Sequence, residues 1–381
     1  MNKLNSLVIW VDNKEERDWS NESLEPTSSE PGNSSTSLEL DINIWKPDDD
    51  NGYLEIGFKI MNWSNKSCLH CILPFSLKQT EIVDKSPFLR EHPAVLEALF
   101  NDSLKIETHE FDPRFAKITR SESNFYLFSP ERNLRIEDTN NDDKQENTHI
   151  IVDIPKDTSK LDKIDIYVRL RFKPSSYAPI ITNENLPARF FSGMSEKMTF
   201  IDFRINSMRS ISYSLRTKAK STEINKVKFF LIVDAWSQVV MGTIKNNSSR
   251  LLEEQIWSDF VNHNTESKDK SYLALQWVKC ALINPLSSLW NTITLNKQSR
   301  SMYYVAYNWS EDRTEKPKIG YDNFIKVKSS KSSRRSFFIT IGAILFAGFL
   351  ASTIANIFWS HELTQCYLSL APQQEQKNAS N

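Results

Sequence analysis

The sequence predicts a mainly β protein: an antiparallel β-sandwich-like body, in one large or two smaller domains with few helices, plus one C-terminal transmembrane helix. Apolar and polar residues alternate with a period of two along many short segments, as in half-buried strands. Helical periodicity is rare, so the helices that a parallel βαβ fold needs after most strands are missing. One uncharged apolar run, Phe337 to Trp359, holds 23 residues, enough to cross a bilayer.

The clearest strand is Ile164 to Phe172, where five apolar residues alternate with Asp165, Tyr167, Arg169 and Arg171. The same alternation marks Leu38 to Ile44 and Leu54 to Ile60. Shorter alternating or apolar segments predict further strands at 7–11, 104–108, 124–128, 149–154, 199–204, 210–215, 227–234, 272–279, 292–295 and 302–307.

Two segments favour helices. Pro93 to Phe100 is a short one, and Ser249 to Val261 carries an apolar stripe that includes Leu252, Ile256 and Phe260. Ser248 or Ser249 is the candidate N-cap of the second helix.

The chain is expected to divide at composition changes. Three prolines between residues 174 and 187 mark a possible domain boundary. The stretch 20–37, after the first strand, is rich in Ser, Glu, Pro and Asn, which is typical of a disordered loop. The expected parts are a β-rich domain at 1–180 with a disordered loop at 20–37, a second β-rich domain or a continuation of the first at 181–325, a basic linker at 326–336, the span at 337–359 and a short tail at 360–381.

Composition excludes several classes of function. Lysine and arginine number 47 against 48 aspartates and glutamates, a balance that argues against a nucleic-acid partner. The 8 glycines are scattered singly, so no loop can cradle a phosphate group, and no cofactor is expected. Four cysteines make no disulfide framework and favour a reducing compartment.

The charges beside the apolar run predict an orientation. Basic residues gather before it and are sparse after it, and positively charged flanks stay cytoplasmic. The body is therefore expected in the cytoplasm, at a bacterial inner membrane, with the tail outside. The alternative is a secreted type I ectodomain, which Asn-X-Ser triplets such as the one at Asn62 would support as glycosylation sites. The residues that set the orientation are Lys326, Lys328, Lys331, Arg334 and Arg335.

Small residues recur every fourth position inside the run. On a membrane helix they would form one smooth face on which two backbones approach closely, and an asparagine there would bond across the interface. This predicts a homo-oligomer through the span; the alternative is that Ala and Gly are simply common in spans. The residues of this face are Ala343, Ala347, Gly348, Ala351, Ser352, Ala355 and Asn356.

Two groups are candidate binding sites. Cys68, His70 and Cys71 form a Cys-X-X-Cys pattern with an internal histidine, which suits zinc if a turn presents it; two ordinary thiols on a strand are the alternative. Arg169, Arg171 and Lys173 line one face of a strand and suit an anionic ligand, or else a solvated outer face. Several of the 10 tryptophans are candidates to line a ligand pocket or a partner surface.

These observations favour a single-pass membrane protein whose β-rich body senses or binds a ligand or partner protein, with a role in bacterial stress or antiviral defence as a conjecture from architecture. A membrane-tethered enzyme is the second reading. Convergence of His109, Glu110 and Asp112 in a cleft would favour it, although no catalytic residue is assigned. A structural or assembly subunit of an envelope complex is the third.

Overall fold

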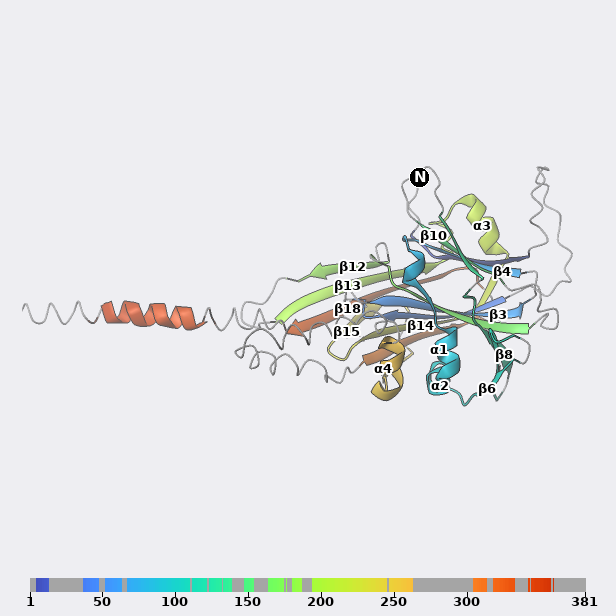
Figure 1. The fold of residues 1–381 in the computed structure, drawn as a ribbon. Helices are drawn as coiled ribbons and strands as arrows, with labels where there is room; N and C mark the ends of the chain where they lie inside the picture. Colours follow the sequence, from blue (N-terminus) through green and yellow to red (C-terminus); the bar gives the residue numbers. More distant parts are fainter. Residues whose placement is uncertain are drawn as a thin grey trace, which may run out of the picture. The chain divides into compact units, whose positions relative to one another are not determined.

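The computed structural model is mainly β, as predicted, and divides into two compact units: residues 1–183 with 199–328, and residues 184–198 with 329–381 (Figure 1). The structure describes residues 5–13, 37–47, 52–63, 67–109, 112–138 except 122 and 132, 147–153, 164–186 except 175 and 177–179, 194–262 except 245–246, 304–332 except 314–317, 342, 344–357 and 359.

The largest sheet has ten strands and runs through the first unit. The short strand β5 (Ile82–Asp84) pairs with one of its central strands, β11. In spatial order the other strands are β16 (Ser248–Leu251), β17 (Tyr304–Asp312), β14 (Glu223–Asp234), β2 (Ser37–Trp45), β3 (Tyr53–Trp63), β11 (Ile164–Phe172), β8 (Asn124–Phe128), β7 (Phe115–Thr119) and β6 (Lys105–Thr108).

Two four-stranded sheets complete the strand content of the described residues. A parallel bridge joins Leu7, just before the first of them, to Ile205 of the second. Their strands in spatial order are β1 (Val8–Asn13), β4 (Ser67–Leu73), β10 (Thr148–Asp153) and β9 (Leu134–Asp138), and then β12 (Ile181–Asn185), β13 (Met194–Ile205), β18 (Tyr321–Ser332) and β15 (Gln238–Gly242).

The main hydrophobic core joins the inner face of the ten-stranded sheet to residues of both smaller sheets. Along β2 the even-numbered residues Leu38, Leu40, Ile42 and Ile44 are buried in this core, together with Ile9 of β1 and others from β4, β10, β13 and β18. Strict alternation sends the odd-numbered residues of β2 to the opposite, outer face.

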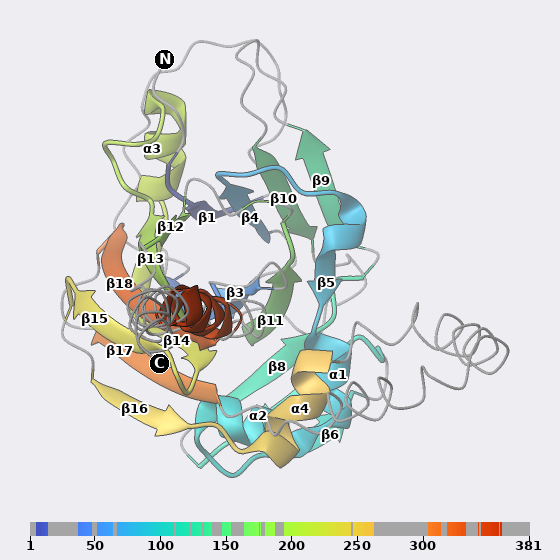
Figure 2. The ribbon, with the colours of Figure 1, turned by 90° about the vertical axis from the view of Figure 1, so that its left-hand side faces the viewer.

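Helices cover that outer face. Figure 2 shows α1 (Ser86–Glu91), α2 (Pro93–Phe100) and α4 (Glu254–Asn262) gathered beside β8 and β6. Their apolar residues form a second core with outer-face residues such as Trp45, Tyr167 and Ala306. The fourth helix, α3 (Tyr213–Lys220), packs on β1, and a 3-10 turn (Gln79–Glu81) precedes β5.

The pairing in the large sheet is mixed rather than purely antiparallel. β14 pairs in parallel with β2, and β11 pairs in parallel with β8 over two residue pairs. Strands distant in sequence meet at the centre of the sheet: β2, β3 and β11 lie before residue 180, and β14 and β17 lie after it. A boundary at 180 therefore does not separate two sheets.

Most predicted strands are confirmed, and β11 has the predicted bounds. The strand predicted at 210–215 is wrong, because α3 begins at Tyr213. Leu215 and Ala219 of α3 lie four residues apart, which is a helical spacing, and they pack with Ile211, two residues before the helix. A window that ends at residue 215 hides this spacing. The strands predicted at 272–279 and 292–295 lie outside the described residues.

Both predicted helices are present, with one correction. α2 has the predicted bounds. The helix predicted at 249–261 begins instead at Glu254, because residues 248–251 form the edge strand β16 against β17. Leu251 consequently faces solvent.

The basic linker predicted at 326–336 is corrected in its first part. β18 continues to Ser332, so Lys326, Lys328 and Lys331 belong to a paired strand, and the Nζ of Lys326 lies 5.4 Å from the ring centre of Phe200. Alternating apolar residues such as Ile325 and Val327, both buried, make this a strand despite its charge. Arg334 and Arg335 lie outside the described residues.

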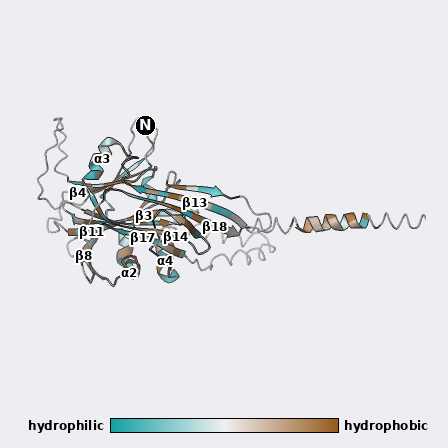
Figure 3. Cartoon of the chain, turned by 180° about the vertical axis from the view of Figure 1, so that it is seen from behind, coloured by the Kyte–Doolittle hydropathy of each residue, from teal (hydrophilic) through white to brown (hydrophobic). Residues whose placement is uncertain are grey.

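The predicted transmembrane helix at 337–359 is wrong for the described part of the chain, where no helix is both long and apolar enough to cross a membrane. Residues 344–357 are helical and mostly apolar (Figure 3). A span needs about 20 apolar residues in one helix. Ala347, Gly348, Ala351, Ser352, Ala355 and Asn356 lie on this exposed helix, and Ala343 lies outside the described residues. Self-association through these residues stays a prediction.

Candidate functional site

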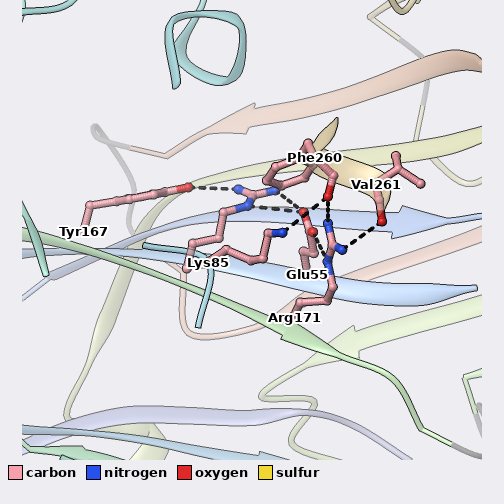
Figure 4. A network of polar contacts seen from close by, with 7 residues as sticks. Glu55, Lys85, Tyr167, Arg171, Phe260 and Val261 are labelled. Carbon is pink, nitrogen blue, oxygen red and sulfur yellow. Dashed lines mark hydrogen bonds and ion pairs between the residues drawn. The ribbon is translucent and has the colours of Figure 1, made fainter. Parts of the chain in front are cut away.

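A fully buried carboxylate organises the outer face of the ten-stranded sheet. Glu55 projects outward from β3, and the register places Arg171 of β11 directly opposite it, with Arg169 opposite Gly57. Arg171 Nε donates to Glu55 Oε1 at 2.7 Å, and Arg169 Nη2 donates to Oε2 at 2.8 Å (Figure 4). All three side chains are inaccessible to solvent. One carboxylate thus holds two guanidinium groups.

The C-terminal end of α4 supplies backbone acceptors to the network. The carbonyl oxygen of Phe260 accepts from Arg171 Nη2 at 2.8 Å and from Lys85 Nζ at 3.3 Å, and the carbonyl of Val261 accepts from Arg171 Nη1 at 3.3 Å. These carbonyls have no partner within the helix, and the helix dipole is negative at this end. The helix terminus therefore compensates part of the excess positive charge.

The charges of the network shift the titration of its members. Burial disfavours the ionised form of Glu55, but the positive charges of Arg171, Arg169 and Lys85 outweigh burial and lower its pKa. Burial, and then repulsion from Arg171, lower the pKa of Lys85 to about 7. At neutral pH the site therefore contains one carboxylate, two permanent cations and one lysine close to its midpoint.

Arg169 is held in place on several sides. Its Nη1 donates to the Tyr167 hydroxyl at 2.9 Å, and its Nε also reaches Glu55 at 3.3 Å. In the amide orientation that satisfies both of its polar atoms, Asn43 accepts from Arg169 Nη2 at 2.5 Å. Four of the five guanidinium hydrogens thus have acceptors among the described residues, and one on Nη1 remains.

The Arg169 side chain lines a pocket on the same outer face. The space between its lining atoms, with open solvent included, is about 390 Å³. Seven of its lining residues are apolar or aromatic, and its polar lining comes from Asp41, Asn43, Arg169 and Arg250. The apolar lining comprises Trp45, Leu99, Phe230, Ile232, Leu252, Trp257 and Ala306.

Two indole groups of the pocket have unused donors. Trp45 and Trp257 are both buried, and neither Nε1 has an acceptor among the described residues. Their rings lie 5.8 Å apart. A buried donor without an acceptor is costly, at about 1–3 kcal/mol. An acceptor group on a ligand would remove that cost.

The charges that border the pocket are mostly positive. Arg169 and Arg250 line it directly, and the single carboxylate of its lining, Asp41, lies 3.4 Å from Lys228 Nζ. Arg250 is exposed at the rim and donates to the carbonyl of Ala98 at 3.1 Å. An anion with an apolar body matches this combination of charge and lining.

The sequence-predicted basic residues are only partly brought together. Arg169 and Arg171 meet at Glu55, but they are buried, and the solvated outer face considered for them is wrong. Lys173 follows the last residue of β11 and is half-buried, and burial and then the charge of Arg171 lower its pKa. Glu55 and Lys85 were not among the predicted site residues, although Glu55 occupies the polar face of an alternating strand.

The Cys-X-X-Cys pattern does not form one site. Three positions along a strand reverse the side-chain direction, so Cys68 and His70 face outward from β4 while Cys71 is buried in the main core. Burial raises the pKa of the Cys71 thiol to about 12, which makes it a poor ligand. Asp12 of β1 joins Cys68 and His70 in place of Cys71.

The acid–base group considered for an enzyme is only partly described. Asp112 pairs with Arg114 at 2.6 Å, and this arginine lowers its pKa by hydrogen bonding. His109 lies beside Phe115 and Tyr126, and Glu110 lies outside the described residues. Comparison of the chain with protein-family models, curated proteins and solved structures found no match.

Proposed function

We propose that this protein binds a small organic anion with an aromatic or apolar body in the pocket on the outer face of the ten-stranded sheet. The main core joins that sheet to both smaller sheets, which supports a β-sandwich-like scaffold beneath the pocket. The function is recognition, in keeping with a sensor or binding protein rather than an enzyme.

The observation that carries the proposal is the position of Arg169. Its guanidinium is fully buried, is fixed by Glu55 and Tyr167, and still lines a pocket whose other lining residues are mostly apolar. A fixed guanidinium loses little conformational entropy when it binds a carboxylate, because its own partners have already ordered it. The ligand's anionic group would meet the remaining Nη1 hydrogen.

The rest of the pocket supports a flat apolar body for this ligand. The rings of Trp45 and Trp257 supply aromatic surface, and their two Nε1 donors suit further acceptor atoms of the ligand. Four basic side chains (Arg169, Arg171, Arg250 and Lys228) face two carboxylates (Glu55 and Asp41), which favours a negative ligand over a neutral one.

Calorimetric titration of the full chain with benzoate and 2-naphthoate, each compared with its neutral amide, tests the proposal. The carboxylates should bind at least about tenfold more tightly than the amides, because a hydrogen bond to a charged group contributes about 1.5–3 kcal/mol. Failure of both carboxylates to bind at millimolar concentration, or equal binding of acid and amide, would contradict it.

Two variants locate the binding within the pocket. Ala306→Leu should abolish carboxylate binding, because the added methyl groups enter the pocket that Ala306 lines. Arg250→Gln should weaken it about tenfold. Arg216→Gln is the matched control, since Arg216 on α3 likewise donates to a backbone carbonyl, that of Ile211 at 3.1 Å, and lies away from the pocket lining.

A further inference from the structure

A line of titratable side chains crosses the outer face of the sheet formed by β1, β4, β10 and β9. His70 Nε2 lies 3.2 Å from Asp12 Oδ1, His70 Nδ1 lies 3.0 Å from His149 Nε2, and His149 Nδ1 lies 3.5 Å from Glu137 Oε2. The ring of Trp10 stacks on His70 with centroids 4.6 Å apart. The Trp10 ring therefore covers one face of His70 and helps to shield the row from solvent.

The row contains more contacts than neutral rings can satisfy. Its three contacts each need one hydrogen, but two neutral imidazoles carry only two N–H groups. If His70 donates to His149 and His149 donates to Glu137, then the lone pair of His70 Nε2 faces the Asp12 carboxylate. A positive species at that position, either a proton or a metal ion, would remove the repulsion.

A third ligand atom is present at this end of the row. Cys68 lies two residues before His70 on the same face of β4, and one ligand atom each from Asp12, Cys68 and His70 lies within 4.8 Å of the others. A thiolate, an imidazole nitrogen and a carboxylate oxygen form a set that suits Zn²⁺. We propose that Asp12, Cys68 and His70 bind a zinc ion, with His149 and Glu137 as supporting residues.

The supporting residues match the usual surroundings of such an ion. A metal-bound histidine commonly gives its other N–H to an acceptor, which fixes its tautomer. When both rings carry their proton on Nδ1, His70 donates to His149 Nε2 and the His149 N–H faces Glu137, so two protons serve the two remaining contacts. The ion replaces the third proton and completes the pattern.

Zinc binding requires the Cys68 thiol to lose its proton. Cys68 Sγ lies 2.7 Å from Asp153 Oδ1, and Asp153 pairs with Arg135 at 2.8 Å. Zinc binding displaces the thiol proton to solvent, so the Cys68 thiolate binds the ion while Arg135 balances Asp153. The Asp12 side chain is 31% exposed, which gives the ion a route from solvent and leaves its fourth position to water.

Titration of the reduced full chain with Co²⁺, which substitutes for zinc and reports thiolate ligation through a near-ultraviolet charge-transfer band, tests the proposal. One equivalent should bind and produce the band, and Zn²⁺ should displace it. Cys68→Ala should abolish the band, whereas Cys71→Ala, the matched control on the opposite face of the strand, should retain it. His149→Ala should weaken Zn²⁺ affinity about 10–100-fold.

Asp12→Asn provides a second test on a partly exposed side chain, in case Cys68→Ala does not fold, and it should weaken binding of either ion more than tenfold. The proposal is overturned if no ion binds at micromolar concentration, including the case in which His70 and His149 only take up a proton. It is also overturned if the band survives in Cys68→Ala or disappears in Cys71→Ala.

Discussion

The hydroxyl group of Tyr167 lies over Gly57, in the space that a side chain at residue 57 would fill. The two residues come from neighbouring strands, β11 and β3, and the absence of a side chain at Gly57 lets the Tyr167 ring lie across the sheet. The same hydroxyl accepts from Arg169 Nη1 at 2.9 Å. A glycine on one strand thereby fixes the direction of an arginine on another.

Gly57→Ala should therefore destabilise the protein by about 1–3 kcal/mol, because the added methyl overlaps the Tyr167 hydroxyl and ring. Chemical denaturation measures the change. The double variant with Tyr167→Phe should lose less than the sum of the two single variants, because the substitutions act at one contact. Strict additivity would show that Gly57 and Tyr167 are not coupled.

Glu55→Gln should cost about 3–5 kcal/mol of unfolding free energy, because it leaves Arg169 and Arg171 buried without their counter-charge. Urea denaturation followed by circular dichroism is the measurement. Glu107→Gln, in a solvent-exposed pair with Lys105, serves as the control and should leave the midpoint unchanged. Equal midpoints for the two variants would refute the central role of Glu55.

Stability should rise with pH between about 7 and 10 through Lys85. Burial lowers the pKa of Lys85 to about 7 from the ordinary 10.5, so across this window the unfolded chain binds the proton that the folded chain has released. The contribution is complete above the unfolded pKa and is lost as pH falls through the folded pKa. Lys85→Met should remove this rise, whereas Lys226→Met, at a partly exposed ion pair, should keep it.

Asp84 should have the opposite effect at lower pH. Burial raises its pKa from 3.8 to about 6, although hydrogen bonds from Ser129 and Ser86 act against the shift. The folded chain then holds a proton that the unfolded chain has lost, so stability from this group is present below pH 4 and is lost as pH rises through 6. Denaturation midpoints from pH 4 to 7 should flatten in Asp84→Asn; an unchanged slope would count against it.

Alternation in the sequence was sufficient to place the central strands and the two faces of each. It predicted Ile164 to Phe172 with its observed bounds, and it put Arg169 and Arg171 on one face. It could not supply their partner, because Glu55 is more than 110 residues away and only the pairing of β3 with β11 brings them together. Pairing between distant strands leaves no local signal.

The errors have a common cause in short windows. Ile211 and Leu215 suggest a strand until Ala219 is considered with them. Near Lys326 the lysines between the apolar residues suggested a basic linker and obscured the alternation of a strand. The Cys-X-X-Cys spacing suggested one site, but on an extended strand that spacing sends Cys68 and Cys71 to opposite faces. Knowing that a segment is a strand decides which residues can meet.

The most direct test of the binding site is a crystal structure of the full chain with 6-bromo-2-naphthoate, whose bromine is located by anomalous scattering. The ring should lie against Trp45 and Trp257, with a carboxylate oxygen about 3 Å from Arg169 Nη1. A ring bound on another face of the protein, or a carboxylate turned away from Arg169 toward solvent, would contradict the proposed function.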